Sequence, residues 1–274
     1  MGLFNWIFGR KKVREIKLGL ALGSGGAKGF AELGAIRAFE EHGIEFQIVG
    51  GTSIGSIVGA FIADGYSSTD IVELLKTIDV SEIKNTFMLG MDTFGLKSVI
   101  DREIGDKNIE ELKKPFVCVA TEMESGKERV FLSGNIADAL CASGCIPPFF
   151  KPVVIEGEKL VDGAFSNSIP ADHVRALGAD YVVGIDLSVR DNKSSLMSKM
   201  LPTYKGVVKE PWVKGYENSD VMIHPDLSGY KSISFGRGDE MFDIGYQTAL
   251  KFIPKIKQDI ERLKGQKVKK NTVK

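Results

Sequence analysis

Strand-like and helical patterns alternate along the first third of the chain, and this alternation most constrains the fold. Residues 16–23 (IKLGLALG) and 46–51 (FQIVGG) are short apolar runs typical of buried strands. A helical pattern follows each run, over residues 27–43 and 56–65. In the first of these, Phe30, Leu33 and Ile36 recur at helical spacing. Alternating strands and helices favour a parallel sheet.

The same reasoning extends to the rest of the chain. Strands are predicted over residues 115–123, 128–133, 180–188 and 220–227, and helices over 67–78, 135–144 and 170–179. Residues 153–164 indicate a hairpin that turns at Glu156 and Gly157. One long helix is expected from about Gly238 to Leu263, and residues 190–219 are expected to form an exposed excursion.

Size and charge limit the classes of protein. With 274 residues, 43% of them apolar, the chain is long enough to bury one large core. Lys plus Arg and Asp plus Glu both total 36, so there is no overall bias toward nucleic acid. The ends are basic, with five cations and one anion in residues 1–17 and nine against two in 251–274. We expect a basic and aromatic segment over 1–16, one domain over 17–263 and a basic tail over 264–274.

Location and cofactor content are also predicted. No apolar run reaches the roughly 18 residues of a membrane-spanning helix. Cys118, Cys141 and Cys145 have neither metal-ligand spacing nor a disulfide pattern, which fits a reducing cytosol. We therefore expect a cytoplasmic protein without metal or cofactor. Its basic ends, including GLFNWIFGRKK, suggest peripheral contact with an anionic membrane on its inner face.

Three short segments carry the chemistry. The first, GSGGAKG (residues 23–29), lies between a strand and a helix, where free backbone N–H groups favour an anion. The second, GTSIG (51–55), has the G-x-S-x-G form of a sharp turn that exposes the serine, Ser53. The third, VDGA (161–164), places Asp162 beside Gly163, and a carboxylate there can accept a serine proton.

In this order the three segments resemble the patatin-like phospholipase family, in particular its small bacterial members. The family has a glycine-rich segment with a basic residue before its last glycine, a G-x-S-x-G turn and a D-G-[GA] motif. Residues 142–153 (ASGCIPPFFKPV) also resemble the segment that precedes the aspartate in the family, and the similarity extends from about residue 17 to 260. Two positions depart from the pattern: Ser24 replaces a glycine, and Glu32 stands where many relatives have histidine.

The resemblance implies a three-layer α/β/α fold with a mostly parallel central sheet, and a serine hydrolase that cleaves acyl esters of lipids. It implies Ser53 as nucleophile and Asp162 as its base, without a histidine between them. The oxyanion would be held by backbone N–H groups. The residues implied for the oxyanion hole are Gly25, Gly26 and Ala27, and the supporting ones are Lys28, Gly29, Gly51, Gly55 and Gly163. Lys28 is either functional or a surface side chain.

Rival interpretations remain open. His42 ends a helix and is expected to be structural. His173 or His224 can serve a Ser-acid-His triad of the α/β-hydrolase type. A dinucleotide-binding site is excluded because no acidic residue ends the second predicted strand. A phosphate-binding loop is excluded because it needs Gly-Lys followed by Ser or Thr, whereas Lys28 here precedes Gly29. A silent lipid-binding or scaffold protein of the same fold is the non-enzymatic alternative. The lipid substrate and the oligomeric state are not indicated by the sequence.

Overall fold

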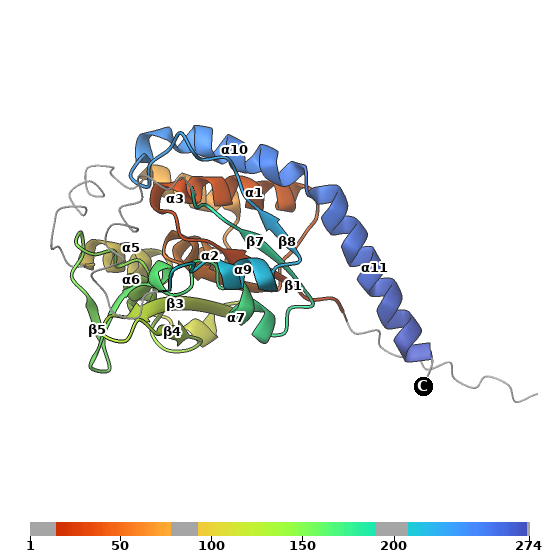
Figure 1. Cartoon of the computed structure of the whole chain (residues 1–274). Coiled ribbons are helices and arrows are strands. Elements are labelled where there is room, and N and C mark those ends of the chain that lie inside the picture. Colours follow the sequence, from red (N-terminus) through yellow and green to blue (C-terminus); the bar gives the residue numbers. More distant parts are fainter. Residues whose placement is uncertain (1–14, 78–92, 190–207, 273–274) are drawn as a thin grey trace, which may run out of the picture.

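A single eight-stranded sheet forms the centre of the protein. The computed structural model describes residues 15–77, 93–189 and 208–272 (Figure 1). The strands lie in the order β5-β6-β3-β2-β1-β7-β8, and β4 pairs with β3 beside this path. Their bounds are β1 Leu18–Leu22, β2 Ile48–Thr52, β3 Phe116–Glu122, β4 Glu128–Phe131, β5 Val153–Ile155, β6 Glu158–Asp162, β7 Tyr181–Ile185 and β8 Val221–Ile223.

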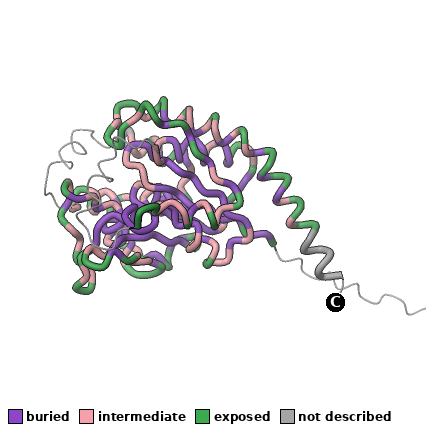
Figure 2. The backbone as a smooth tube through the Cα atoms, in the orientation of Figure 1, coloured by how far each residue is buried: buried purple, intermediate pink, exposed green. Residues whose placement is uncertain are grey.

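Helices cover both faces of this sheet. The α-helices are α1 Gly29–Glu41, α2 Ile54–Asp64, α3 Ser68–Thr77, α5 Phe94–Glu103, α6 Ile136–Ser143, α7 Ala171–Ala176, α9 Val213–Asn218, α10 Gly238–Leu250 and α11 Ile253–Thr272. The larger apolar cluster joins one face of the sheet to α1, α2 and α6. The smaller joins the other face to α7 and α9. The predicted three-layer α/β/α architecture is confirmed, and Figure 2 shows its buried centre.

The direction of the strands decides where functional groups can gather. The pairs β1–β2, β2–β3, β1–β7 and β7–β8 are parallel. Strands β4, β6 and β5 pair antiparallel to their neighbours, which confirms the predicted hairpin at Glu156 and Gly157. The segments that follow β1 and β2 therefore lie at the same edge of the sheet. Strand β6 runs the other way beside β3 and pairs Asp162 with Ala120 at that edge.

The C-terminal helical region differs from the expected single helix. Helix α10 ends at Leu250, and a new helix begins at Ile253 (Figure 1). Pro254 explains the break, because its ring lacks an N–H and clashes with the carbonyl four residues earlier, which is that of Leu250. Helix α11 then continues through residue 264, where the basic tail was predicted to begin, and ends at Thr272.

Helices α1 and α10 pack so closely that their backbones meet. A Cβ on Gly34 of α1 would lie 1.9 Å from the carbonyl oxygen of Phe242. A Cβ on Gly245 of α10 would lie 1.9 Å from the carbonyl oxygen of Ala31. Real side chains cannot occupy such space, so glycine at both positions sets the distance between the helices. This contact holds the beginning of α1 in place against the rest of the fold.

We expect Gly245→Ala to destabilise the protein by about 2 kcal/mol, since the added methyl forces α10 away from α1. Gly236→Ala is the matched control, because a Cβ there meets nothing within 4 Å. Urea unfolding of the two variants and the parent measures the difference. Equal midpoints for the two variants would show that the helices tolerate separation.

Candidate active site

Ser53 lies at the turn between β2 and α2 with strained backbone dihedrals. Its φ is 57° and its ψ −124°, a positive φ that non-glycine residues rarely adopt. Three contacts maintain this conformation. The N–H groups of Ser56 and Ile57 donate to the Ser53 carbonyl at 2.9 and 3.3 Å, and the Ser53 N–H donates to Oγ of Ser143 at 2.9 Å. The G-x-S-x-G prediction of a sharp strand-to-helix turn is therefore matched by the backbone.

The two glycines of this motif are required by packing. A Cβ on Gly51 would lie 2.0 Å from the carbonyl oxygen of Gly55, and a Cβ on Gly55 would lie 2.6 Å from the Leu22 backbone. The start of α2 thus rests directly on the end of β1. Any side chain at either position would push Ser53 out of its turn.

The Ser53 hydroxyl meets a carboxyl group from far downstream. Its Oγ donates to Oδ2 of Asp162 at 2.6 Å across 109 residues of sequence. The second oxygen of Asp162, Oδ1, accepts the N–H of Ala164 at 2.8 Å. Gly163 allows the chain to turn here, since a Cβ would lie 2.1 Å from the Val119 carbonyl oxygen. Both carboxylate oxygens are thereby fixed relative to the hydroxyl.

Burial changes the acidity of this carboxyl. Asp162 is fully buried, and Ser53 is 3% exposed. Loss of hydration disfavours the carboxylate and raises the pKa of Asp162 from 3.8 to about 7, although hydrogen bonds from Ser53 and Ala164 act in the opposite direction. Asp162 is therefore a far stronger base than an exposed aspartate, and it changes charge near neutral pH.

The backbone N–H groups of the glycine-rich loop are divided between anchors and open donors. The Gly23 N–H donates to Oε1 of Glu32 at 2.7 Å. The Ser24 N–H donates to the Ser168 carbonyl at 3.0 Å, and the Ala27 N–H to the Ser232 carbonyl at 2.8 Å. Ala27 was predicted as an oxyanion donor, but its N–H is engaged in this arrangement.

The N–H groups of Gly25 and Gly26 have no acceptor within the described part of the chain. Gly26 adopts a φ of 59°, and a Cβ there would lie 2.4 Å from the Ser232 carbonyl oxygen. Among the described residues the loop thus leaves two adjacent N–H groups unengaged, at two of the three positions that the sequence indicated.

Lys28 and Gly29 complete this segment. The structure buries Lys28, which is 7% exposed, so the alternative of a surface side chain is wrong. Gly29 begins α1 where a Cβ would lie 2.5 Å from Cγ1 of Ile54, the first residue of α2. The two helices that start at the candidate site therefore touch at their N-termini.

Two supporting hydroxyls were missed by sequence reasoning. Ser143, at the end of α6, accepts the Ser53 N–H and donates to the Val119 carbonyl at 2.7 Å. Thr121 donates from Oγ1 to the Asp162 carbonyl at 2.9 Å. Serine and threonine are common in helices and strands, and no local pattern distinguishes these two. Ser143 does lie within the ASGCIPPFFKPV segment, which was its one available signal.

The histidines lie in other contacts. His173 Nε2 is 2.8 Å from Oε2 of Glu128, and His224 Nε2 is 2.7 Å from the Ser188 carbonyl. Neither forms a hydrogen bond with Ser53 or Asp162. His42 Nδ1 meets the Ala38 carbonyl at 2.8 Å in the last turn of α1, in keeping with a structural role.

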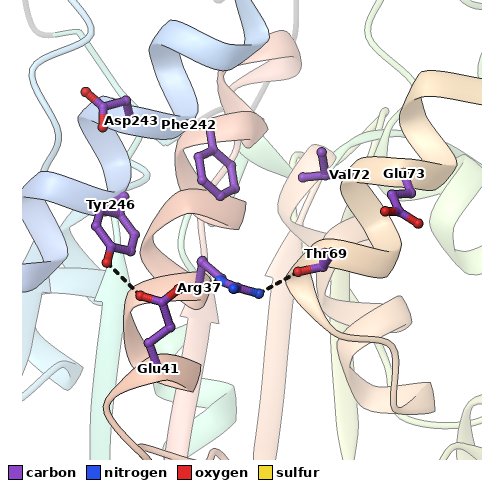
Figure 3. Close-up of a pocket in the computed structure, with 8 residues that line it drawn as sticks. All are labelled: Arg37, Glu41, Thr69, Val72, Glu73, Phe242, Asp243 and Tyr246. Atoms are coloured by element: carbon purple, nitrogen blue, oxygen red, sulfur yellow. Dashed lines mark hydrogen bonds and ion pairs between the residues drawn. The ribbon is translucent and has the colours of Figure 1, made fainter.

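Potential metal ligands and hollows lie elsewhere among the described residues. Ligand atoms of Glu128, Asp172 and His173 lie within 4.8 Å of one another. Lys214 forms an ion pair with Glu128, so a positive charge from the protein itself already lies beside these three side chains. Contacts with His173 and Lys214 outweigh burial and lower the pKa of Glu128 to about 2. A hollow of about 400 Å³ lies between α1, α3 and α10. The residues that line it, drawn in Figure 3, include none of the predicted site residues.

Within the described ranges, no helix combines the length and apolar character needed to cross a membrane. Residues 1–14 of the predicted basic and aromatic N-terminal segment (1–16) lie outside the described residues.

Comparison with known proteins defines the class. The model of the patatin-like phospholipase family matches residues 20–175, more than half of the chain, and includes Ser53 and Asp162. The chain therefore belongs to the patatin-like phospholipase family.

Relatives of known name agree with this assignment. The chain is 30% identical over 275 residues to patatin-like phospholipase domain-containing protein 7 of Mus musculus, with 84% of this chain and 20% of that protein covered. It is 27% identical over 283 residues to lysophospholipase nte1 of Aspergillus fumigatus, with 88% and 18% covered. The chain thus spans about a fifth of the length of these relatives.

A solved structure supports the fold alone. VipD from Legionella pneumophila superimposes with a TM-score of 0.54 at 15% sequence identity, covering 88% of this chain and 67% of VipD.

We expect the stability of the parent protein to fall as pH rises from about 4 to about 7, because the pKa of Asp162 is higher in the folded than in the unfolded chain. Asp162→Asn removes that titration. The stability of the variant relative to the parent should therefore increase by a few kcal/mol over this pH range and then level off. Chemical unfolding at several pH values measures it.

Ser53→Ala is the matched control for this measurement, because it keeps the buried carboxyl and should keep the decline. Parallel stability curves for the parent and Asp162→Asn would contradict the raised pKa.

Proposed function

We propose that the protein is a serine acyl hydrolase that cleaves acyl ester bonds of lipids through Ser53 and Asp162. The observation that supports this most is the 2.6 Å hydrogen bond between Ser53 Oγ and Asp162 Oδ2 inside a buried site. A hydroxyl becomes a nucleophile when a neighbouring base takes its proton in the transition state. Efficient bases have a pKa close to the working pH, and burial brings the pKa of Asp162 to about 7.

The proposed reaction has two halves. In the first, Ser53 Oγ attacks the ester carbonyl carbon while its proton passes to Asp162, and the carbonyl oxygen becomes an oxyanion. The N–H groups of Gly25 and Gly26 stabilise that oxyanion. The tetrahedral intermediate collapses, the carbon–oxygen bond to the alcohol breaks, and Asp162 returns the proton to the leaving alcohol.

The second half repeats the steps with water. Asp162 takes a proton from a water molecule that attacks the acyl-Ser53 ester. A second oxyanion forms at the same N–H groups. As it collapses, the bond between the acyl carbon and Ser53 Oγ breaks, Asp162 returns the proton to Oγ, and the fatty acid is released. The strained turn at Ser53 supports this role, because it keeps the hydroxyl off the backbone of its own helix.

The substrate class rests on the relatives. Their names include lysophospholipase and patatin-like phospholipase, which favours a lipid acyl ester over a peptide or a sugar ester. The basic ends of the chain favour peripheral contact with an anionic membrane surface, where such esters are found. The silent-scaffold alternative is less consistent with the site, because the serine, the carboxyl and two open N–H donors are all present.

A fluorophosphonate probe tests the nucleophile. The parent should be labelled and should hydrolyse both short and long acyl esters, with a rate that rises to a plateau above about pH 7 as Asp162 becomes ionised. Ser53→Ala should not be labelled. Asp162→Asn should lose about a thousandfold or more in rate, since the base is gone while the hydroxyl remains. Ser68→Ala, which removes a buried hydroxyl that bonds Glu40 away from the candidate site, is the matched control and should keep both labelling and activity. A folded parent that is neither labelled nor active would favour the scaffold alternative.

The rival triad is tested by removing both downstream histidines. Combined His173→Asn and His224→Asn should leave hydrolysis of a soluble ester within about threefold of the parent, because neither ring contacts Ser53 or Asp162. A loss of a hundredfold or more would instead indicate a Ser-acid-His mechanism.

The His173→Asn variant can also be tested by its stability at different pH values. Contact with Glu128 raises the pKa of His173, so its stabilising effect is complete below the ordinary value of 6.5 and is lost as pH rises through the folded value. His173→Asn should therefore destabilise the protein more at pH 6 than at pH 9.

A further inference from the structure

Glu32 is a fully buried carboxyl group that the proposed reaction does not use. It lies in the first turn of α1, directly after the glycine-rich loop, and is 0% exposed. Its Oε1 accepts the N–H of Gly23 at 2.7 Å. Its Oε2 is buried and has no hydrogen-bond partner among the described residues. A buried carboxyl with one unsatisfied oxygen destabilises the folded state. A function of the hydrogen bond from the Gly23 N–H would explain why the chain keeps Glu32 there.

That bond is one of three anchors of the loop. The N–H groups of Gly23, Ser24 and Ala27 are engaged, while those of Gly25 and Gly26 have no acceptor in the part of the chain that the structure describes. The anchors of Ser24 and Ala27 are backbone carbonyls, of Ser168 and Ser232. Among the described residues, Glu32 is thus the one side chain that binds an N–H of this loop. A substitution can remove this anchor directly, whereas the other two anchors are backbone carbonyls.

The anchor is also rigidly supported. Glu32 is between Ala31 and Gly34 of α1, the stretch whose backbone touches α10 at Gly245 and Phe242. The backbone that carries Glu32 therefore cannot shift without moving the helix pair. The Cα of Gly23 is also confined, because a Cβ on Gly23 would lie 2.6 Å from the Ile185 carbonyl oxygen. The N–H of the peptide before it is held by its bond to Glu32.

The charge state of Glu32 fits a place close to a developing oxyanion. Burial strongly disfavours the carboxylate, which keeps the pKa of Glu32 well above its ordinary range. A neutral acid can still accept the Gly23 N–H through its carbonyl oxygen. It adds no negative charge that would oppose an oxyanion in a medium of low dielectric constant.

We propose that Glu32 is a positioning residue: by holding the Gly23 N–H it fixes the loop so that the N–H groups of Gly25 and Gly26 face the oxyanion formed at Ser53. The inference rests on the proposed function. Glu32 itself does not touch substrate. Without its anchor the Gly23 peptide can rotate, and the two open donors lose the alignment that transition-state stabilisation requires.

The test compares Glu32→Met with Glu32→Gln. Methionine has a similar volume and suits a helix but cannot accept the Gly23 N–H, whereas glutamine keeps a neutral acceptor oxygen. With a short soluble ester, Glu32→Met should lower kcat by about 10- to 100-fold while KM changes less than about threefold. Glu32→Gln should restore kcat to within about threefold of the parent. An alkyl trifluoromethyl ketone, whose adduct with Ser53 carries an oxyanion, should lose affinity for Glu32→Met by a factor similar to the loss in kcat.

Asp64→Asn is the matched control. Asp64 is also a buried carboxyl, 5% exposed, but it pairs with Lys107 at the far end of α2. Its loss should lower stability without a change in kcat or in inhibitor affinity, which separates positioning from a general effect of removing a buried acid.

Each outcome is decisive. A Glu32→Met variant with the kcat and inhibitor affinity of the parent overturns the inference, as does a folded Glu32→Gln variant that loses more than tenfold in kcat. If Glu32→Met does not fold, Glu32→Gln alone still tests the role of the acceptor. A parent that neither hydrolyses esters nor reacts with fluorophosphonate refutes the proposed function instead. That result comes from the parent alone, so it is distinct from any result obtained with the Glu32 variants.

Discussion

The hydrogen bond between Ser53 and Asp162 is the interaction on which the rest of the site depends. The two residues are 109 positions apart, and both are removed from water. They meet because β6 lies antiparallel beside β3, with Asp162 opposite Ala120, while β2 delivers Ser53 from the other side of β3. A slip of one residue in the β3–β6 register would turn the carboxyl to the opposite face of the sheet. The apolar core on both faces of the sheet keeps that register.

The candidate site concentrates unfavourable features that the surrounding fold maintains. Ser53 has a positive φ, and Asp162 and Glu32 are both buried. Among the described residues, Asp162 has no cation beside it and one oxygen of Glu32 has no hydrogen-bond partner. Each of these destabilises the folded state, and each lies at the same edge of the sheet. The rigid neighbours are the helix pair α1 and α10, joined through glycine contacts, and the parallel strands at the centre. This distribution is typical of functional sites, where local strain persists because the structure around it leaves no alternative.

Most elements could be predicted because their signals are local. The apolar runs of β1, β2 and β7 and the helical spacing of α1 indicated the central layer and its cover correctly. The single long helix after Gly238 was wrong, although Pro254 was visible in the sequence and marks the break. Lys28 is buried although lysine side chains are usually exposed, which the sequence alone left open. Ser143 and Thr121 were missed, since their partners are backbone groups on distant strands.

The sequence by itself determined the strand-turn-helix at Ser53, the glycines around it and the presence of an Asp-Gly turn, because steric crowding acts between residues close in the chain. Only the tertiary structure decided that Asp162 touches Ser53 and that its pKa is near 7. It also decided that Ala27 donates its N–H to Ser232, while Gly25 and Gly26 have no acceptor among the described residues. These properties depend on burial and on partners such as Ser232 and Glu32. Burial and distant hydrogen bonds exist only after the sheet has brought separate segments together, so no local pattern can contain them.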